Sequence, residues 1–120
     1  MPITPLYITQ HDRRPYYYVT VKDASGNLID LTGYTIRCTM KALGGSTPKI
    51  DRRTTGVTLA DQSSNKGLFY LNWQIGDTNT VGTYNIEFEL TPSADSDKFT
   101  FPNPEHGPAQ VIISAGQDDQ

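Results

Sequence analysis

The chain has few side chains that carry covalent or acid–base chemistry: its single cysteine is Cys38, and its two histidines are His11 and His106. A catalytic cysteine needs a histidine that acts as its base. Cys38 alternates with Ile36 and Met40 in a pattern of period two, which predicts that it points into a core. We therefore expect Cys38 to be a small buried hydrophobic residue.

Metal and hydrolase sites are not indicated either. His11 and His106 lie in proline-rich polar stretches, and neither has a second histidine or cysteine at a ligand spacing. Glu87 and Glu89 lie two residues apart, which places both on one solvated strand face. The sequence predicts that the protein is not an enzyme and has no catalytic residue, metal or cofactor.

Length and charge narrow the class of partner. The 120 residues, 36% of them hydrophobic, are enough for one modest core. Ten Lys and Arg against 13 Asp and Glu give a net charge of −3, so we expect no binding to nucleic acid or to a membrane. The N-terminal stretch has no apolar run of the length that a signal peptide or membrane helix needs, so we expect the protein to be made in a cytoplasm.

Alternation of apolar and polar residues predicts an all-β protein. It is clearest in residues 34–41, 68–74 and 84–91. Weaker strand signals cover residues 16–22, 56–60, 97–101 and 109–114. The sequence DASGN, at residues 23–27, has the composition of a tight hairpin connection. About seven short strands at this spacing predict a two-sheet antiparallel β-sandwich.

The two ends differ in composition from the middle. Residues 1–15 carry three prolines and a charged stretch, and residues 115–120 are polar and acidic. We expect an extended N-terminal arm at 1–15, the sandwich at 16–114 and a short C-terminal tail at 115–120. The basic cluster in residues 49–53 is interpreted as a solvated loop.

Three consecutive tyrosines, at residues 16–18, are the strongest indication of a binding surface. Consecutive strand residues cannot all face one core, so at least one ring points away from the sheet. Either this strand forms a docking surface, since tyrosine is enriched at protein interfaces, or the proline-rich arm of the same molecule covers it. We expect the protein-interaction residues to be Tyr7, Arg13, Arg14, Tyr16 and Tyr18.

The stretch from Asp77 through Gly82 to Tyr84 predicts a tyrosine corner. In immunoglobulin-like sandwiches, a tyrosine at the start of a late strand turns its hydroxyl back onto the preceding loop. Ile86 stands two residues later, where a cysteine would complete the disulfide of such a domain. We therefore expect an immunoglobulin-like sandwich that is held together by packing alone.

Three stretches of the sequence, taken in order, resemble a known family. They are RRPYYYVTVKDASGNLIDLTGYTIRCTMK, GLFYLNWQIGDTNTVGTYNIEFELT and FTFPN. Together they are similar to small tailed-bacteriophage structural proteins, typified by the immunoglobulin-like N-terminal domain of the phage baseplate upper protein. The resemblance covers most of residues 13–114 and makes six residues structural by position: Asp30, Gly33, Trp73, Asp77, Gly82 and Tyr84.

The resemblance also implies a role. We expect a virion structural protein of the tail, baseplate or another external assembly, made in the host cytoplasm and present in several copies. Its partners would be other virion proteins, including further copies of this chain. A baseplate upper protein continues into a long distal region, whereas this sequence stops soon after Ile113, so we expect an adaptor or decoration module. The alternative is a carbohydrate-binding module for adsorption to the host surface, with Trp73 as a stacking platform.

Overall fold

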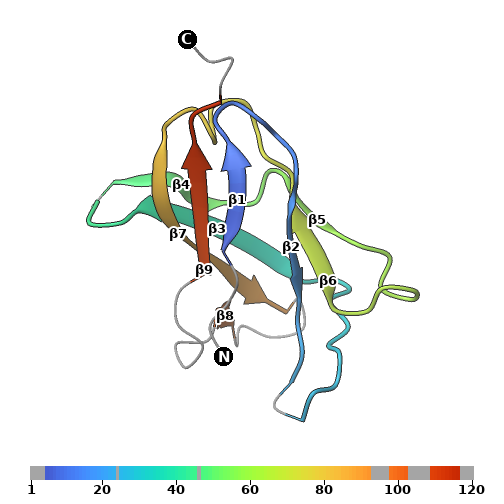
Figure 1. Ribbon diagram of the computed structural model, residues 1–120. Coiled ribbons are helices and arrows are strands. Elements are labelled where there is room, and N and C mark those ends of the chain that lie inside the picture. Colours follow the sequence, from blue (N-terminus) through green and yellow to red (C-terminus); the bar gives the residue numbers. More distant parts are fainter. Residues whose placement is uncertain (1–4, 24, 46, 93–97, 103–108, 117–120) are drawn as a thin grey trace.

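All regular structure in the described part of the chain is β-strand (Figure 1). The computed structural model describes residues 5–23, 25–45, 47–92, 98–102 and 109–116. Nine strands in these residues form two sheets, which confirms the predicted all-β class and exceeds the expected count of about seven strands. No described segment forms a helix with the length and hydropathy needed to cross a membrane. His106, residues 1–4 of the expected arm and residues 117–120 of the expected tail lie outside the described residues.

The two sheets differ in size. The larger sheet contains β1 (Leu6–Thr9), β3 (Thr35–Ala42), β4 (Pro48–Arg53), β7 (Gly82–Thr91), β8 (Phe99–Phe101) and β9 (Ala109–Ser114). Its order is β1-β9-β7-β3-β4, and β8 pairs with the second half of β7. The smaller sheet contains β2 (Tyr17–Thr20), β5 (Val57–Leu59) and β6 (Leu68–Leu71), in the order β2-β6-β5.

The central strands β3 and β7 follow the alternation read from the sequence. In β3 the side chains of Ile36, Cys38 and Met40 are buried, and the residues between them face outward. The two strands pair antiparallel without interruption, from Thr35 opposite Thr91 to Ala42 opposite Tyr84. Successive side chains of a strand point to opposite faces, so this register brings the apolar side chains of both strands to one face.

The core lies between the two sheets. Phe88 of the larger sheet packs against two residues of the smaller one: its ring centroid is 5.0 Å from that of Phe69, edge to face, and 5.7 Å from that of Tyr17. Phe69 and Phe88 have no exposed surface, and each contributes roughly 2–3 kcal/mol through burial. One continuous cluster of buried side chains joins the sheets, as a two-layer domain requires.

Residues Leu6–Thr9, which the sequence placed in an N-terminal arm, form β1 and belong to the larger sheet. β1 pairs parallel with β9, with Leu6 opposite Val111 and Ile8 opposite Ile113. Ile8 is buried in the core, and the burial of this apolar side chain favours the pairing of β1 with β9. The structure therefore corrects the expectation for these four residues, and the sheet is mixed instead of purely antiparallel.

The basic cluster in residues 49–53 is a strand, not a solvated loop. It forms most of β4, pairs with β3 and buries Ile50. The turn after β2 is as predicted: the Asp23 carboxylate accepts hydrogen bonds from the backbone N–H groups of Ser25 and Asn27, both at 2.9 Å. These bonds hold the pKa of Asp23 below its usual value. A bridge between Lys22 and Leu28 closes the hairpin.

Candidate functional site

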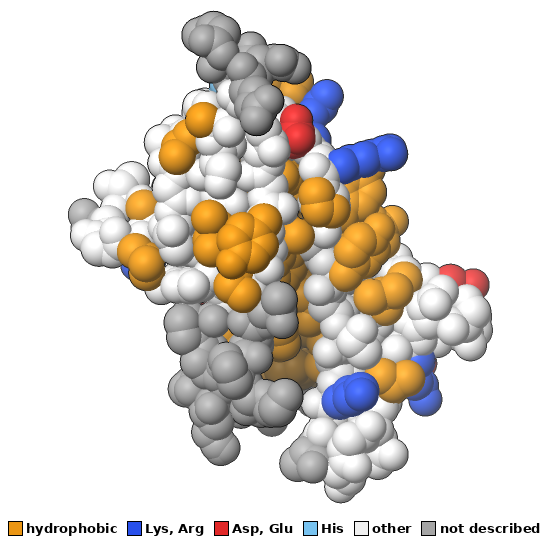
Figure 2. Space-filling view, in the orientation of Figure 1, with side chains coloured by type: hydrophobic (Ala, Val, Ile, Leu, Met, Phe, Trp, Pro, Cys, Tyr) orange, Lys and Arg blue, Asp and Glu red, His pale blue; other side chains and the backbone are white. Residues whose placement is uncertain are grey.

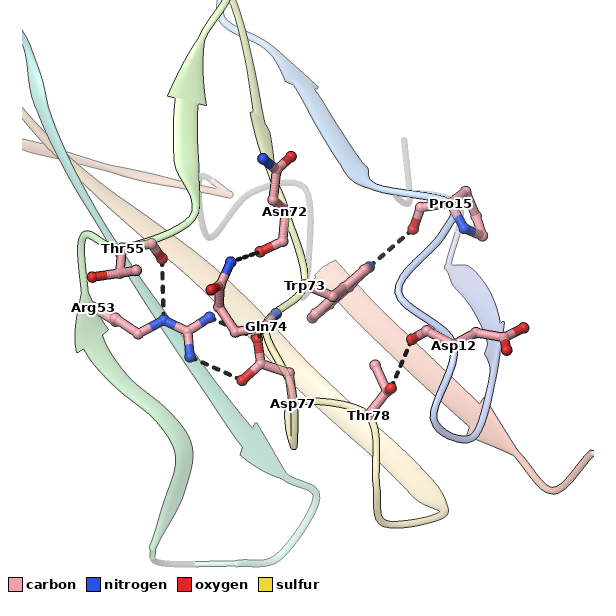
Figure 3. Close-up of polar contacts among 9 residues, drawn as sticks. All are labelled: Asp12, Pro15, Arg53, Thr55, Asn72, Trp73, Gln74, Asp77 and Thr78. Atoms are coloured by element: carbon pink, nitrogen blue, oxygen red, sulfur yellow. Dashed lines mark hydrogen bonds and ion pairs between the residues drawn. The ribbon is translucent and has the colours of Figure 1, made fainter. Parts of the chain in front are cut away.

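The segment that links β1 to β2 is fixed against the loop that follows β6 (Figure 3). The Trp73 indole Nε1–H donates to the carbonyl oxygen of Pro15 at 2.9 Å. The Thr78 hydroxyl donates to the carbonyl oxygen of Asp12 at 2.7 Å, and the backbone N–H of His11 donates to the carbonyl oxygen of Thr78 at 3.0 Å. Residues 11–15, which carry Arg13 and Arg14, are therefore held in place by the body of the domain.

Trp73 lies two residues beyond the end of β6, whereas the sequence predicted that it belongs to the strand. Its side chain is buried, with 3% of its surface exposed. A sugar-stacking platform needs an accessible ring face. Trp73 therefore does not serve as the platform that the carbohydrate-binding alternative assigned to it, and its position is structural.

The loop after β6 is anchored by an ion pair that the sequence did not indicate. Both terminal nitrogens of Arg53 donate to the carboxylate of Asp77, at 2.8 and 2.7 Å (Figure 3). The same carboxylate accepts the backbone N–H of Gln74 at 2.7 Å. Hydrogen bonding to Asp77 raises the pKa of Arg53 above its usual value. This pair ties the end of β4 to the loop that holds Thr78.

The other residues that the resemblance made structural lie in the turn before β3 or at the start of β7. The Tyr84 hydroxyl donates to the carbonyl oxygen of Thr80 at 2.8 Å, which is the corner contact that the sequence predicts. Asp30 accepts hydrogen bonds from the backbone N–H and the hydroxyl of Thr32, at 3.0 and 2.7 Å, and these lower the pKa of Asp30. Gly33 has a φ of 83°, which glycine adopts without strain, and Gly82 begins β7.

The outer face of the smaller sheet carries a row of aromatic rings, Tyr16, Tyr70 and Tyr18, which we call the tyrosine row. Tyr16 and Tyr70 are stacked, with centroids 5.7 Å apart and an interplanar angle of 10°. Tyr18 lies directly opposite Tyr70 on the paired strands, and their centroids are 5.3 Å apart. Arg14 extends over the ring of Tyr16, with 5.5 Å between the guanidinium carbon and the ring centroid. Tyr17 points the other way, into the core.

The tyrosine row is exposed at Tyr18 and half-buried at Tyr16 and Tyr70. Tyr18 exposes 58% of its surface, so the segment before β2, whose Arg14 lies over Tyr16, leaves Tyr18 uncovered. Figure 2 shows hydrophobic side chains, a class that there includes Tyr, gathered over the region where β2 and β6 lie in Figure 1. A group of Lys and Arg side chains adjoins them. The structure therefore shows that Tyr18 is not covered by the arm, whereas the binding of a partner to this face stays a prediction.

The structure brings together most of the expected interaction residues and adds one. Arg14, Tyr16 and Tyr18 meet at the tyrosine row. Tyr7 is 65% exposed on β1 in the larger sheet and makes none of these aromatic contacts. Sequence reasoning missed Tyr70, although alternation in residues 68–74 places it opposite to the buried Phe69. Only the pairing of β2 with β6 brings Tyr70 beside Tyr18.

A hollow of about 510 Å³ adjoins the tyrosine row. Its lining consists of His11, Asp12, Arg13, Arg14, Tyr16, Asn72 and Trp73. In the described part of the chain, the ion pairs use Arg52, Arg53 and Lys98, and none uses Arg13 or Arg14. The Asn72 Oδ1 atom is buried without a hydrogen-bond partner (Figure 3). The hollow is therefore lined by two arginines that form no ion pair with another described residue, and by the aromatic side chains of Tyr16 and Trp73.

Cys38 has the character expected of a core residue. It has no exposed surface, and burial raises the pKa of its thiol to about 12, so it stays protonated at neutral pH. Among the described residues, no three His, Cys, Asp or Glu side chains lie close enough together to hold a metal ion.

Two comparisons of the sequence with known proteins found no relative. The sequence matches none of the protein-family models against which it was compared, and no curated protein sequence matches it either.

Proposed function

We propose that this chain is an immunoglobulin-like structural domain of a bacteriophage virion, a non-enzymatic adaptor that binds other virion proteins. Its docking surface is the outer face of the smaller sheet. The observation that carries the docking role is the exposed tyrosine row with Arg14 packed on it.

Two observations support the immunoglobulin-like part of the proposal. The order β9-β7-β3-β4 in one sheet and β2-β6-β5 in the other corresponds to strands G-F-C-C′ and B-E-D of a variable-type immunoglobulin domain. The hydrogen bond from Tyr84 to Thr80 sits where such domains have their tyrosine corner, at the start of strand F. With a single cysteine the chain has no such disulfide, and the packing of Phe88 on Phe69 and Tyr17 helps to join its two sheets.

The docking role follows from the composition and rigidity of the surface. Tyrosine and arginine are the residues that most often dominate the binding energy of protein interfaces. The rings of Tyr16 and Tyr70 are already stacked on each other, so these two side chains lose little freedom when a partner binds. A two-layer sandwich holds this face rigid and presents it to a neighbour.

The virion assignment is supported by the three ordered stretches of sequence that resemble phage baseplate upper proteins. In such particles a protein is present in many copies, so weak contacts at each tyrosine row add through avidity. The carbohydrate-binding alternative has less support, because Trp73 is buried and the stacked rings of Tyr16 and Tyr70 present few free faces to a sugar.

Crosslinking in intact particles tests the proposal. A photoreactive phenylalanine analogue replaces Tyr18 in one variant and Arg37, an exposed residue of β3 in the other sheet, in the control. After illumination of purified virions, mass spectrometry identifies the attached chains. We expect a virion protein on the residue-18 probe at several times the yield seen at residue 37. Absence of the chain from purified particles, or equal yields at the two positions, contradicts the proposal.

A further inference from the structure

We propose that the hollow beside the tyrosine row binds an acidic peptide segment of the partner protein, with Arg13 and Arg14 holding its carboxylates. This inference rests on the proposed function, because it names the chemistry of the partner that the docking face recognises.

The charge around the hollow is opposite to the charge of the chain. The whole sequence has a net charge of −3, yet the charged residues of the lining are two arginines against one aspartate. Arg13 and Arg14 are exposed and belong to none of the ion pairs among the described residues. A guanidinium group has a planar fork of donors that matches a carboxylate. Among the described residues, no carboxylate pairs with these two arginines, so both are available to a ligand.

The walls of the hollow are fixed before any ligand binds. Trp73 is buried and bonded to the carbonyl oxygen of Pro15, and Thr78 holds the backbone of Asp12. Tyr16 is stacked on Tyr70. Because the backbone of residues 11–15 is anchored in this way, a ligand has to order only the two arginine side chains and not the segment that carries them.

The hollow is continuous with the docking face, which favours a protein segment over a free acidic sugar. Tyr16 belongs to both, because it lines the hollow and is the first ring of the tyrosine row. A sugar would need a free face of this ring, but Tyr70 and Arg14 already lie against it. A peptide that continues into a partner domain covers the hollow with its carboxylates and the row with its apolar side chains.

Trp73 is the only tryptophan of the chain and lines the hollow, so its fluorescence reports binding there directly. The probe is the tetrapeptide acetyl-Asp-Glu-Asp-Glu-amide, added to the purified full chain. We expect a saturable change in emission that acetyl-Asn-Gln-Asn-Gln-amide produces only at concentrations at least about 10-fold higher, which corresponds to about 1.4 kcal/mol. Raising sodium chloride from about 50 to about 500 mM should weaken binding of the acidic peptide, because salt screens exposed charges.

Three variants assign the effect to residues. R13A/R14A should lower the affinity for the acidic peptide at least about 10-fold. R13K/R14K should restore part of the affinity, because lysine keeps the positive charge but lacks the planar pair of donors of a guanidinium group. R37A removes another exposed arginine, which lies on β3, and should leave affinity unchanged. The thermal unfolding midpoints of all three variants should match that of the parent chain, since the substituted side chains are exposed.

Other outcomes overturn the inference. It fails if the neutral peptide binds as well as the acidic one, or if R13A/R14A binds like the parent. It also fails if trigalacturonate, an acidic trisaccharide, or sodium sulfate at equal ionic strength binds at least as tightly as the acidic peptide. Particle crosslinking through residue 18 without peptide binding leaves the proposed function standing and removes this inference. If the chain binds the peptide but is absent from particles, the proposed virion role fails and the acidic-peptide site stands.

Discussion

Arg53 and Asp77 form an ion pair through two hydrogen bonds, and Asp77 is only 5% exposed. Asp77 is followed by Thr78, which holds the backbone of Asp12. The end of β4, the loop after β6 and the segment that carries the hollow are therefore connected through one chain of polar contacts (Figure 3).

Replacing Asp77 with asparagine should lower the free energy of unfolding by about 2–4 kcal/mol, because it leaves the partly buried Arg53 without its counter-charge. Urea unfolding followed by Trp73 fluorescence measures the change. The control is R52Q, since Arg52 pairs with Glu89 while 62% of its side chain is exposed, and it should change stability by no more than about 0.5 kcal/mol. Equal effects of the two substitutions would show that burial does not strengthen the Asp77 pair.

Tyr84→Phe should cost about 1 kcal/mol, because it removes the single hydrogen bond to Thr80 and keeps the buried ring. The same change at Tyr18, whose ring is 58% exposed, is the control and should have almost no effect on urea unfolding. A Tyr84→Phe variant as stable as the parent would mean that water satisfies Thr80 equally well.

Stability should fall in alkaline solution. Burial raises the pKa of Cys38 to about 12 and that of Tyr17 to about 12, whereas in the unfolded chain these groups ionise near about 8.5 and about 10. Above those lower values the folded state binds more protons than the unfolded state. The free energy of unfolding therefore decreases with rising pH, by up to about 1.4 kcal/mol per pH unit for each group, until the folded groups also ionise.

Urea unfolding at a series of pH values measures this slope, and Cys38→Ala provides the comparison. The variant is less stable at neutral pH because it leaves a cavity, but its stability should decline less steeply between about pH 9 and about pH 10. Identical slopes for the parent and the variant would mean that the Cys38 thiol ionises as easily in the folded protein as in the unfolded chain.

Gly67→Ala should be markedly more harmful than Gly26→Ala. Both glycines have left-handed backbone conformations, with φ of 83° and 87°, which cost alanine about 1 kcal/mol. A Cβ at residue 67 would also lie 2.7 Å from the carbonyl oxygen of Val21, whereas one at residue 26 meets nothing within 4 Å. We expect losses of about 3 and about 1 kcal/mol in urea unfolding. Similar losses would indicate that the chain near Val21 shifts freely.

The sequence predicted the elements whose signals are local. Alternation placed Cys38 inside β3 and Tyr84 at the inner face of β7, because burial of one face imposes period two on a long central strand. The turn at residues 23–27 was equally readable, since an aspartate that bonds its own following backbone needs no distant partner.

Features that depend on distant partners could not be read in this way. β1 is four residues long and pairs with β9 about a hundred residues away, so its sequence carries no sign of the parallel pairing. Arg53 looked like part of a solvated cluster because its partner, Asp77, lies 24 positions further along. Trp73 has the spacing of a strand residue, but it lies beyond the end of β6, where its indole donates to the carbonyl oxygen of the distant Pro15.

The candidate site was predicted in part for the same reason. Consecutive tyrosines at residues 16–18 guarantee that rings point outward, and the structure places Tyr16 and Tyr18 there. The third ring, Tyr70, and the hollow formed with Trp73 arise only from the register of β2 on β6 and from the packing of residues 11–15.

The parallel pairing of β1 with β9 also determines how the domain responds to mechanical load. The chain enters the pairing at Leu6 and leaves it at Ser114, at opposite ends of the two strands. A pull between these points slides one strand along the other, so the bridging hydrogen bonds share the tension instead of opening one after another as in a peeled hairpin. A domain built into an assembly that is stretched along this axis would resist unfolding through that joint.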